Sequence, residues 1–283
     1  MEKKRILILD AKVFLSSLIV ALFILIPLAV KWKIDLKYAL IGIFLFSGIT
    51  AAILSLNFIR NIFVFPWILV VEAALIVLLI VTTMGFSIYR DPERIPPQGK
   101  NIIVSPADSK VLYVKEIRKG EIPFSKKKGR KHKLEELTKT GFLSNGEAYQ
   151  IGILMTYLDV HVVRAPINGH IRLIKHVPGK FISLRKEEAI LVNERVTTTI
   201  ENNELRIAVV QIASRVVRRI LPYVKIGQEV KIGERIGIIK FGSQVDLVIP
   251  KGPGIRIYVK PGDKVKAGVS IIAGYKTELD LSQ

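Results

Sequence analysis

Four short stretches of the sequence carry residue types that could do chemistry. They are YRDPER (89–94), SPADSKV (105–111), YLDVHVVRAPINGHI (157–171) and IKFGSQVDLVIP (239–250). They include an acid, Asp108, a histidine, His161, and a serine that follows a glycine, Ser243. A histidine can pass protons because its pKa lies near the working pH. Each stretch is weak evidence by itself, since a lone Gly-Ser pair carries no information and a lone histidine in a strand is usually packed.

The composition removes several other chemistries. The 283 residues include no Cys and only four His. Thiol catalysis, a Cys-ligated metal and a disulfide-stapled secreted module are therefore excluded. A His-rich metal site is not expected either, so we predict a site without a metal.

The chain after Tyr89 has the pattern of a β-rich domain, which would have to position these stretches. A linker rich in Pro and Gly (92–99) is followed by short β-branched runs separated by Gly, Pro and Asn. Polar and apolar residues alternate in HIRLIKHV and in IRIYV, which predicts a mainly antiparallel β-fold with one buried face. One helix is predicted over residues 214–221, ending before Pro222.

The sequence also contains an internal repeat. GQEVKIGERIGII begins at Gly227 and GDKVKAGVSIIAG begins at Gly262, and both read G-x-x-V-x-x-G. The glycines suit tight turns, and the alternating apolar residues suit paired strands. The repeat is similar to the hairpins of the small sandwiched barrels of lipoyl and biotinyl domains, which predicts a fold and says little about activity.

The N-terminal third is predicted to be a membrane anchor. The net charge is +19 and yet the mean hydropathy is +0.38, a combination that two regions of different character explain. Residues 1–86 hold 8 Lys/Arg and 4 Asp/Glu, whereas the rest of the chain holds 35 and 20. Three apolar runs are each long enough to cross about 30 Å of hydrocarbon as helices: residues 13–30, 38–59 and 66–87. We expect an anchor over residues 1–87 and a second domain over residues 88–283, and a buried soluble helical bundle is the alternative.

Two charged features have open interpretations. Glu72 interrupts the third apolar run, where it could be functional or could lie at headgroup level. Residues 118–140 form an insertion with nine Lys/Arg against three Glu, which could be a solvated loop or could dock on anionic lipid. Nucleic-acid binding is not expected, because aromatic residues are not interleaved with the basic ones. Basic residues flank the apolar runs almost evenly, so they do not set the orientation.

In this order and over this length, the four stretches resemble those of phosphatidylserine decarboxylase proenzymes, most closely the shorter type that also serves archaetidylserine decarboxylation. Further matching segments are VPGKF (177–181), NERV (193–196) and the pair Arg218–Arg219. The resemblance implies a membrane-anchored, mainly β (α+β) lyase of phospholipid biosynthesis that makes phosphatidylethanolamine. It also implies a homodimer. We expect an integral protein of the cell membrane with the catalytic domain on the cytoplasmic face.

The resemblance further implies a pyruvoyl enzyme that cuts its own chain between Gly242 and Ser243. Ser243 would attack the carbonyl of Gly242, which has no Cβ to obstruct a strained turn. β-Elimination and hydrolysis would then leave a pyruvoyl group at the new N-terminus, with a long chain of residues 1–242 and a short chain of residues 243–283. The pyruvoyl group would form a Schiff base with the serine headgroup of phosphatidylserine in an anionic membrane and let CO2 leave. No external cofactor would be needed.

Residue roles follow from the same resemblance. Asp108 matches the family's acidic residue that helps to activate the serine, although an Asp after Pro-Ala could instead form a turn. His161 matches a family histidine tied to decarboxylation, as proton donor or substrate contact. Many relatives have the motif His-x-x-His-x-Pro. Here Arg164 occupies the place of the second histidine, and an arginine is a poor general base. Either His161 serves both steps or self-cleavage uses another base. Arg164 and Arg195 are candidates for binding the lipid phosphate.

Three other interpretations compete with this one. A membrane-anchored binding module with a lipoyl-like hairpin explains the repeat and the apolar runs, but not the three motifs in one chain. A peptidase with a similar core needs a paired His and an acidic metal set, which the sequence lacks. A catalytically dead relative would keep the motifs without the activity. The lipid backbone, diacylglycerol or archaeal diether, is left open.

Overall fold

In a computed structural model, the chain divides into two compact units, Met1–Ser87 and Ile88–Gln283. The structure describes residues 11–32, 34–56, 67–118, 121–122, 132–133, 138, 146–184, 189–214, 219–240, 243–252 and 254–276, with residues 121–122, 132–133 and 243 described in their backbone alone. Gly242 and most of the basic insertion 118–140 lie outside the described residues.

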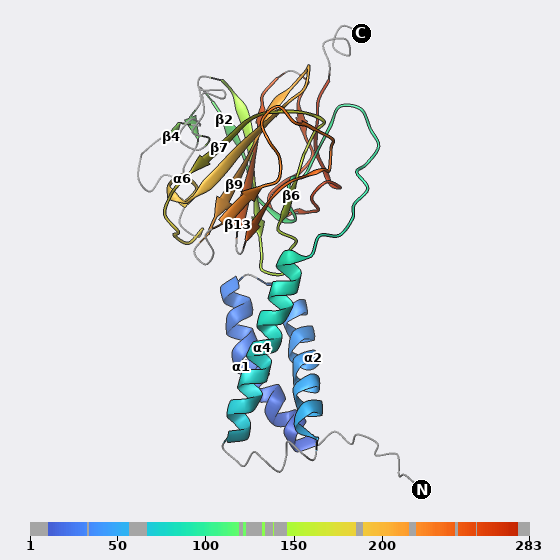
Figure 1. The fold of residues 1–283 in the computed structure, drawn as a ribbon, viewed down its shortest axis with the longest axis vertical. Coiled ribbons are helices and arrows are strands. Elements are labelled where there is room, and N and C mark those ends of the chain that lie inside the picture. Colours follow the sequence, from blue (N-terminus) through green and yellow to red (C-terminus); the bar gives the residue numbers. More distant parts are fainter. Residues whose placement is uncertain are drawn as a thin grey trace. The chain divides into compact units, whose positions relative to one another are not determined.

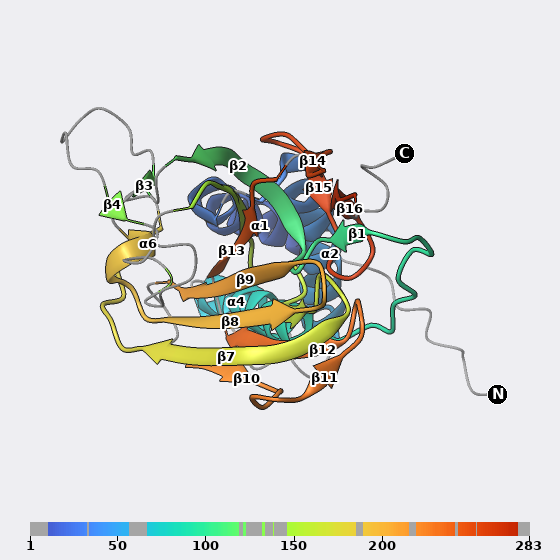
Figure 2. The ribbon, with the colours of Figure 1, turned by 90° about the horizontal axis from the view of Figure 1, so that it is seen from above.

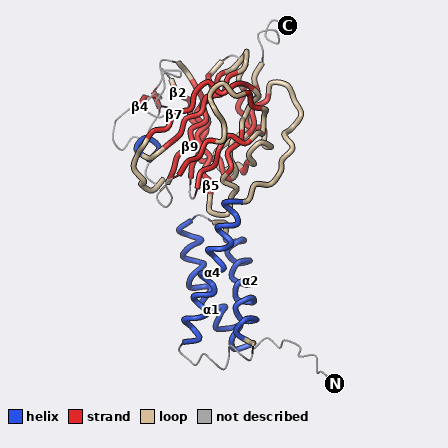
Figure 3. Tube along the Cα trace, in the orientation of Figure 1, coloured by secondary structure: helices blue, strands red, loops and turns tan. Residues whose placement is uncertain are grey.

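The first unit is formed by three long apolar helices, which Figure 1 and Figure 3 show as coiled segments: α1 (Ala11–Trp32), α2 (Leu36–Leu54) and α4 (Trp67–Tyr89), of which the last two residues fall in the second unit. Each is long and apolar enough to cross a membrane. The second helix ends earlier than its apolar run predicts, at Leu54 instead of residue 59, and residues 57–66 lie outside the described part. Side chains from all three helices pack together, among them Ala21, Ile43 and Ile76.

Glu72 lies inside this unit, fully buried. Its Oε1 accepts hydrogen bonds from the hydroxyls of Ser16, at 2.5 Å, and Ser17, at 3.1 Å, so α4 is joined to α1 by polar contacts. The neighbouring helices enclose the carboxyl group, so the side chain bonds to α1 instead of extending away from the helices. Serine side chains commonly bond across packed apolar helices, whereas a glutamate inside such a helix is rare and usually faces the interior of the bundle.

The second unit is built on an eight-stranded antiparallel sheet with the order β11-β7-β8-β9-β13-β5-β2-β15. Figure 2 shows that this sheet is curled, with β7, β8 and β9 side by side. Its strands are β2 (Ser109–Ile117), β5 (Ala148–Met155), β7 (Gly169–Val177), β8 (Arg195–Glu201), β9 (Arg206–Ala213), β11 (Glu229–Val230), β13 (Ser243–Pro250) and β15 (Lys264–Val265). The main core consists of Ile, Val and Leu side chains that alternate inward along these strands, such as Val245 and Leu247 of β13. The prediction of a β-rich, mainly antiparallel unit is confirmed.

Two three-stranded sheets accompany the large one. The first has the order β1-β16-β14 and the second the order β10-β12-β6. Their strands are β1 (Ile102–Val104), β16 (Ile271–Gly274), β14 (Arg256–Ile257), β10 (Arg219–Pro222), β12 (Arg235–Lys240) and β6 (Val162–Arg164). A short hairpin of β3 (Glu121–Ile122) and β4 (His132–Lys133) and a single helical turn, α6 (Ala189–Val192), complete the described elements.

The helix predicted over residues 214–221 is wrong where the structure describes it. Residues 219–222 form strand β10, which pairs with β12 from Arg219–Lys240 to Pro222–Gly237. Pairing with a neighbouring strand satisfies the backbone groups there, and this tertiary contact outweighs local helix propensity. Residues 215–218 lie outside the described part.

The two copies of the glycine repeat are used in the same way. Gly233 donates its N–H to the carbonyl of Ala165, and Gly268 donates to Ser105, both at 2.8 Å. Both glycines have positive φ, 80° and 71°, which favours glycine at these turns. The two turns touch, since a Cβ on Gly268 would lie 3.1 Å from the Cα of Gly233. The repeat therefore joins two similar halves of the second unit, one beginning at Ser105 and the other at Ala165.

Candidate active site

His161 lies at the end of a short loop between β5 and β6 and is fully buried. Asp159 shapes this loop, because its Oδ2 accepts hydrogen bonds from the N–H and the hydroxyl of Thr156, both at 2.7 Å. His161 Nδ1 lies 2.8 Å from the carbonyl oxygen of Asp159. A carbonyl can only accept, so Nδ1 carries the proton and Nε2 is left with its lone pair.

The protonation state of His161 follows from its surroundings. Burial lowers the pKa of His161, and the bond to the Asp159 carbonyl and the negative charges of Asp159 and Asp108 oppose this effect. Among the described residues, Nε2 has no hydrogen-bond partner. The loop thus holds a neutral imidazole with one nitrogen free to accept a proton.

The backbone of His161 pairs with the strand that leads to the predicted cleavage site. The carbonyl of His161 accepts from the N–H of Ile239, at 3.2 Å, and Ile239 lies four residues before Ser243. Ser243 begins β13 and pairs with Met155 of β5 and Ala213 of β9. The residue before it, Gly242, is outside the described part, so the bond predicted to be cut is not described.

Asp108 sits at the turn between β1 and β2 and is tied on two sides. Its carboxylate pairs with Arg94 through both oxygens, at 2.5 and 2.8 Å, and Oδ1 also accepts from the N–H of Ala267, at 2.8 Å. Arg94 Nη1 reaches the carbonyl of Ala267 as well, at 2.7 Å. The two side chains of the ion pair are only 9% and 12% exposed, so the pair is largely shielded from water.

The second half of the repeat contains a counterpart of Asp108. Asn168 Oδ1 accepts from the N–H of Ile232, at 2.7 Å, as Asp108 accepts from Ala267. Ile232 and Ala267 are the residues before the two repeat glycines. Because an amide does the same work at Asn168, the turn itself does not require a carboxylate at residue 108. The negative charge of Asp108 is therefore not needed to form this turn.

Residues 89–94, which we call the strap, lie against both of these loops. Arg90 Nη2 donates to the carbonyl of Leu158 in the His161 loop, at 2.8 Å. Lys240 places its ammonium 5.5 Å from the centre of the Tyr89 ring, a cation–π contact next to the undescribed residues 241–242. With Arg94 on Asp108, the strap contacts three of the motif segments.

The two arginines that are candidates for binding the lipid phosphate, Arg164 and Arg195, are both buried and both donate hydrogen bonds within the protein. Arg164 is 3% exposed and donates to Gly233 O, at 2.9 Å, to Asp91 Oδ1, at 2.8 Å, and to Pro92 O, at 3.0 Å. Burial lowers its pKa, and Asp91 opposes this. Arg195 is 1% exposed and donates to the carbonyls of Leu191, at 2.7 Å, and Asn193, at 3.0 Å. A role of either guanidinium in phosphate binding stays a prediction.

Sequence reasoning did not assign roles to the charged residues of the strap. Asp91 pairs with Arg164 and Arg235, and Arg235 Nη2 also binds Glu93 Oε1, at 2.6 Å. The available signal was the motif itself, which holds four charges besides its tyrosine and proline in six residues. Its partners are 70 or more residues away in sequence for Arg164 and Arg235, and pairing at that distance cannot be read from spacing.

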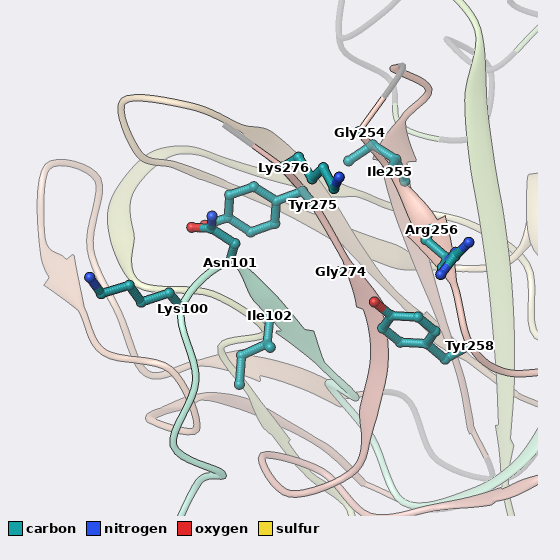
Figure 4. Close-up of a pocket in the computed structure, with 10 residues that line it drawn as sticks. All are labelled: Lys100, Asn101, Ile102, Gly254, Ile255, Arg256, Tyr258, Gly274, Tyr275 and Lys276. Carbon is teal, nitrogen blue, oxygen red and sulfur yellow. The ribbon is translucent and has the colours of Figure 1, made fainter. Parts of the chain in front are cut away.

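A hollow of about 460 Å³ lies elsewhere in the second unit, against the sheet β1-β16-β14. Figure 4 shows residues that line it, including Lys100, Arg256, Tyr258 and Lys276. None of the predicted site residues is in its lining.

The comparisons with known proteins agree with one another. A family model described as phosphatidylserine decarboxylase matches residues 85–273. A protein of Methanocaldococcus jannaschii, provisionally named an archaetidylserine decarboxylase proenzyme, is 42% identical over 190 residues, which cover 67% of this chain and 89% of that one. A protein of Methanothermobacter thermautotrophicus with the same provisional name is 32% identical over 219 residues, 77% of this chain and 93% of that one. The phosphatidylserine decarboxylase proenzyme of Desulfotalea psychrophila is 34% identical over 204 residues, 71% of this chain and 84% of that one. By the extent of these matches, the chain belongs to the phosphatidylserine decarboxylase family of lyases.

Proposed function

We propose that this chain is a self-cleaving decarboxylase of serine-headgroup phospholipids, whose active short chain begins at residue 243. The state of His161 carries the proposal. Its Nδ1–H is held by the Asp159 carbonyl, and its buried Nε2 has no partner among the described residues. Such a nitrogen is a base without a proton donor, and its backbone lies beside β12, which leads to Ser243.

The described residues fit a pyruvoyl group at position 243. β13 begins at Ser243 with paired neighbours on both sides, so a new N-terminus there keeps its place in the sheet. When present, a pyruvoyl carbonyl joined to the substrate amine withdraws electrons from the α-carbon, so that CO2 can leave. No other prosthetic group is required by the proposal.

Self-cleavage needs one base that acts twice. Ser243 Oγ attacks the carbonyl carbon of Gly242, His161 Nε2 takes the hydroxyl proton and returns it to the departing amide nitrogen, and an ester results. The base then removes the α-proton of residue 243, the Cβ–O bond breaks, and residues 1–242 leave as a carboxylate. Water hydrolyses the remaining enamine after it tautomerises and releases ammonia. Asp108 assists because its negative charge favours the protonated form of His161.

The same residues serve the decarboxylation. His161 in its protonated form can deliver a proton to the substrate α-carbon after CO2 has left, and Asp108 again favours that form. Arg164 and Arg195 are the candidates for the lipid phosphate. Each now donates to backbone carbonyls, and Arg164 Nε has no hydrogen-bond partner among the described residues, so this nitrogen could donate to a phosphate oxygen without giving up a bond.

We further propose that the three helices anchor the enzyme in the cell membrane, with the residues from 88 onward on the cytoplasmic face. Large apolar side chains such as Phe23, Phe44 and Phe86 are more than half exposed on the helices. Lipid would cover this surface, because exposing so large and continuous an apolar surface to water is unfavourable. A homodimer and a lipoyl-like barrel within the second unit remain part of the proposal.

The mass of the purified chain tests the self-cleavage. We expect two products, the smaller holding 41 of 283 residues in a 31.7 kDa chain, or about 4.6 kDa. Ser243→Ala should stay at full mass and release no CO2 from vesicles that contain phosphatidylserine or archaetidylserine, whereas the wild type should act on at least one of the two. A wild-type chain that stays whole, or a Ser243→Ala variant that still decarboxylates, contradicts the proposal.

A further inference from the structure

A buried polar cluster lies across strands β2, β5 and β13, and the reaction outlined above does not use it. We call it the Asp246 cluster; it consists of Tyr113, Gln150, Gln244 and Asp246. Asp246 is fully buried. Its Oδ2 accepts from the Tyr113 hydroxyl, at 2.7 Å, and from Gln150 Nε2, at 2.5 Å, and its Oδ1 accepts from Gln244 Nε2, at 2.6 Å. Gln244 Nε2 also lies 2.8 Å from the Tyr113 oxygen, which closes the cluster.

The sheet is shaped to admit this cluster. Tyr113, Gly152 and Asp246 are paired in one row across the three strands. A Cβ on Gly152 would lie 2.5 Å from Cζ of Tyr113, so the ring passes directly over the glycine to reach the carboxylate. A glycine in the middle of a strand weakens it, and here it makes room for another side chain. The Tyr113 ring therefore fills the space that the missing side chain of Gly152 leaves.

A buried polar cluster is costly where its groups are not bonded; here the Asp246 carboxylate accepts three bonds, while Gln150 Oε1 has no partner among the described residues. A buried carboxylate loses its hydration, and apolar residues of the same size would commonly be at least as stabilising. Burial raises the pKa of Asp246, while the bonds from Gln244, Tyr113 and Gln150 oppose this. Burial and the nearby carboxylate also raise the pKa of Tyr113, so its hydroxyl stays a donor. A strongly bonded cluster of this kind specifies one strand register more sharply than it adds stability.

The position of the Asp246 cluster next to Ser243 indicates why a fixed strand register would matter there. Gln244 directly follows Ser243, so after the proposed cleavage it becomes the second residue of the short chain, at a free chain end. Chain ends fray unless they are tied down. Gln244 and Asp246 would belong to the short chain, and Tyr113 and Gln150 to the long chain.

We propose that the Asp246 cluster is a positioning device that holds the first residues of the short chain in register once the bond before Ser243 has been cut. It keeps residue 243 in place by side-chain bonds between the two chains. Before cleavage the covalent link to residue 242 restrains the same strand end, so the cluster matters most afterwards. This inference rests on the proposed function, because it needs the cleavage to occur.

Tyr113→Phe tests it, since this change removes the hydroxyl and keeps the ring. We expect the full-length chain to cleave at the wild-type rate. In the cleaved enzyme, kcat per cleaved chain should fall about tenfold, the effect of one lost buried hydrogen bond, with KM unchanged. Amide hydrogen exchange at residues 244–246 should rise by a similar factor in the cleaved enzyme. In an uncleaved Ser243→Ala background, Tyr113→Phe should leave that exchange nearly unchanged.

Two further variants keep the result clear. Tyr258→Phe removes a hydroxyl from an exposed tyrosine that directly follows β14, away from the cluster, and should behave as wild type. Gln244→Met removes the amide that donates to Asp246 and to Tyr113 and keeps the length of the side chain, and it should reproduce the effect of Tyr113→Phe if that variant fails to fold. Equal kcat and equal exchange in the cleaved wild type and in either cluster variant overturn the inference while the proposed function stands. A wild-type chain that never cleaves overturns both.

Discussion

At the scale of single residues, the exchange of a second histidine for Arg164 has a structural counterpart. Arg164 donates to Gly233, Asp91 and Pro92, and so it fastens the strap to a repeat turn instead of supplying a base. His161 is left with a fixed tautomer and a free Nε2 among the described residues. The alternative in which His161 serves both steps therefore needs no additional group.

The pH dependence of self-cleavage provides the first prediction. Because burial lowers the pKa of His161, the base stays neutral to lower pH than an exposed histidine would. We expect a constant cleavage rate from pH 8 down to about 6.5, the usual histidine pKa, and a decline only at more acidic pH. The free energy of unfolding should also fall as the pH drops below about 6.5, because the unfolded chain takes up a proton there that the folded chain does not. Gel densitometry of freshly made proenzyme over a pH series measures the rate.

Replacement of the histidine separates its two roles. His161→Ala should slow self-cleavage by about 100-fold or more, the usual contribution of a general base. A variant that still cleaves at the wild-type rate but does not decarboxylate would show that another group is the base for cleavage.

The two halves of the repeat provide a matched pair of substitutions. Asp108→Asn keeps an oxygen for the Ala267 N–H, as Asn168 does for Ile232, but it removes the charge that faces Arg94 and His161. We expect roughly tenfold or slower self-cleavage and a loss of up to about 3 kcal/mol in stability from the broken ion pair. The control, Asn168→Asp, lies at an exposed position and should leave both quantities unchanged. Equal cleavage rates for the two variants would assign Asp108 to the turn alone.

At the scale of elements, local sequence patterns correctly predicted those helices, strands and turns that are determined by residues close together in the chain. The three apolar runs, the antiparallel strands and the repeat turns follow from hydropathy, alternation and glycine spacing, and the structure contains helices, strands and turns there. The error over residues 219–222 has the opposite origin, because pairing with β12 decides that segment. The strap could be found as a motif, but its ion pairs join residues far apart in the chain and appear only in the fold.

The row that crosses β5 provides a prediction for the sheet. Gly152→Ala places a methyl group 2.5 Å from the Tyr113 ring, which must move away from Asp246. We expect a loss of about 1–3 kcal/mol in the free energy of unfolding, as for other overpacked cores. Thermal denaturation in the uncleaved Ser243→Ala background measures it. Gly252→Ala is the control, since its nearest neighbour would be 3.9 Å away, and an equal melting temperature for both variants would contradict the crowding argument.

At the scale of the whole molecule, charge and hydropathy belong to different units. The apolar excess lies in the helices of the first unit, and residues 87–283 hold 35 basic against 20 acidic residues. Positive charge on the unit that would meet an anionic lipid raises the local concentration of substrate. Whether residues 118–140 carry a large share of this effect stays a prediction, because most of them lie outside the described part.

Salt should therefore act on substrate capture more than on chemistry. Raising the ionic strength from 0.05 to 0.5 M shortens the range of exposed charges to a few ångström. With vesicles that contain phosphatidylserine, we expect KM to increase severalfold and kcat to stay constant. With the same lipid diluted in neutral detergent micelles, the increase in KM should be much smaller. An equal salt response for the two forms would exclude attraction to the anionic surface as the cause.

The central place of β13 in the sheet has a consequence for the lifetime of the enzyme. β13 pairs with β9 and β5, and β15 and β16 pair with β2 and β1, so the short chain is interwoven with the long one. Cutting the bond before Ser243 leaves these pairings in place, but unfolding then releases two separate polypeptides. Refolding becomes a bimolecular reaction, which slows in proportion to dilution. The uncut Ser243→Ala chain should recover its fold after heating at any concentration, whereas the processed enzyme, once melted at low concentration, should be lost for good. Maturation would thus convert a reversibly folding protein into one that is assembled only once.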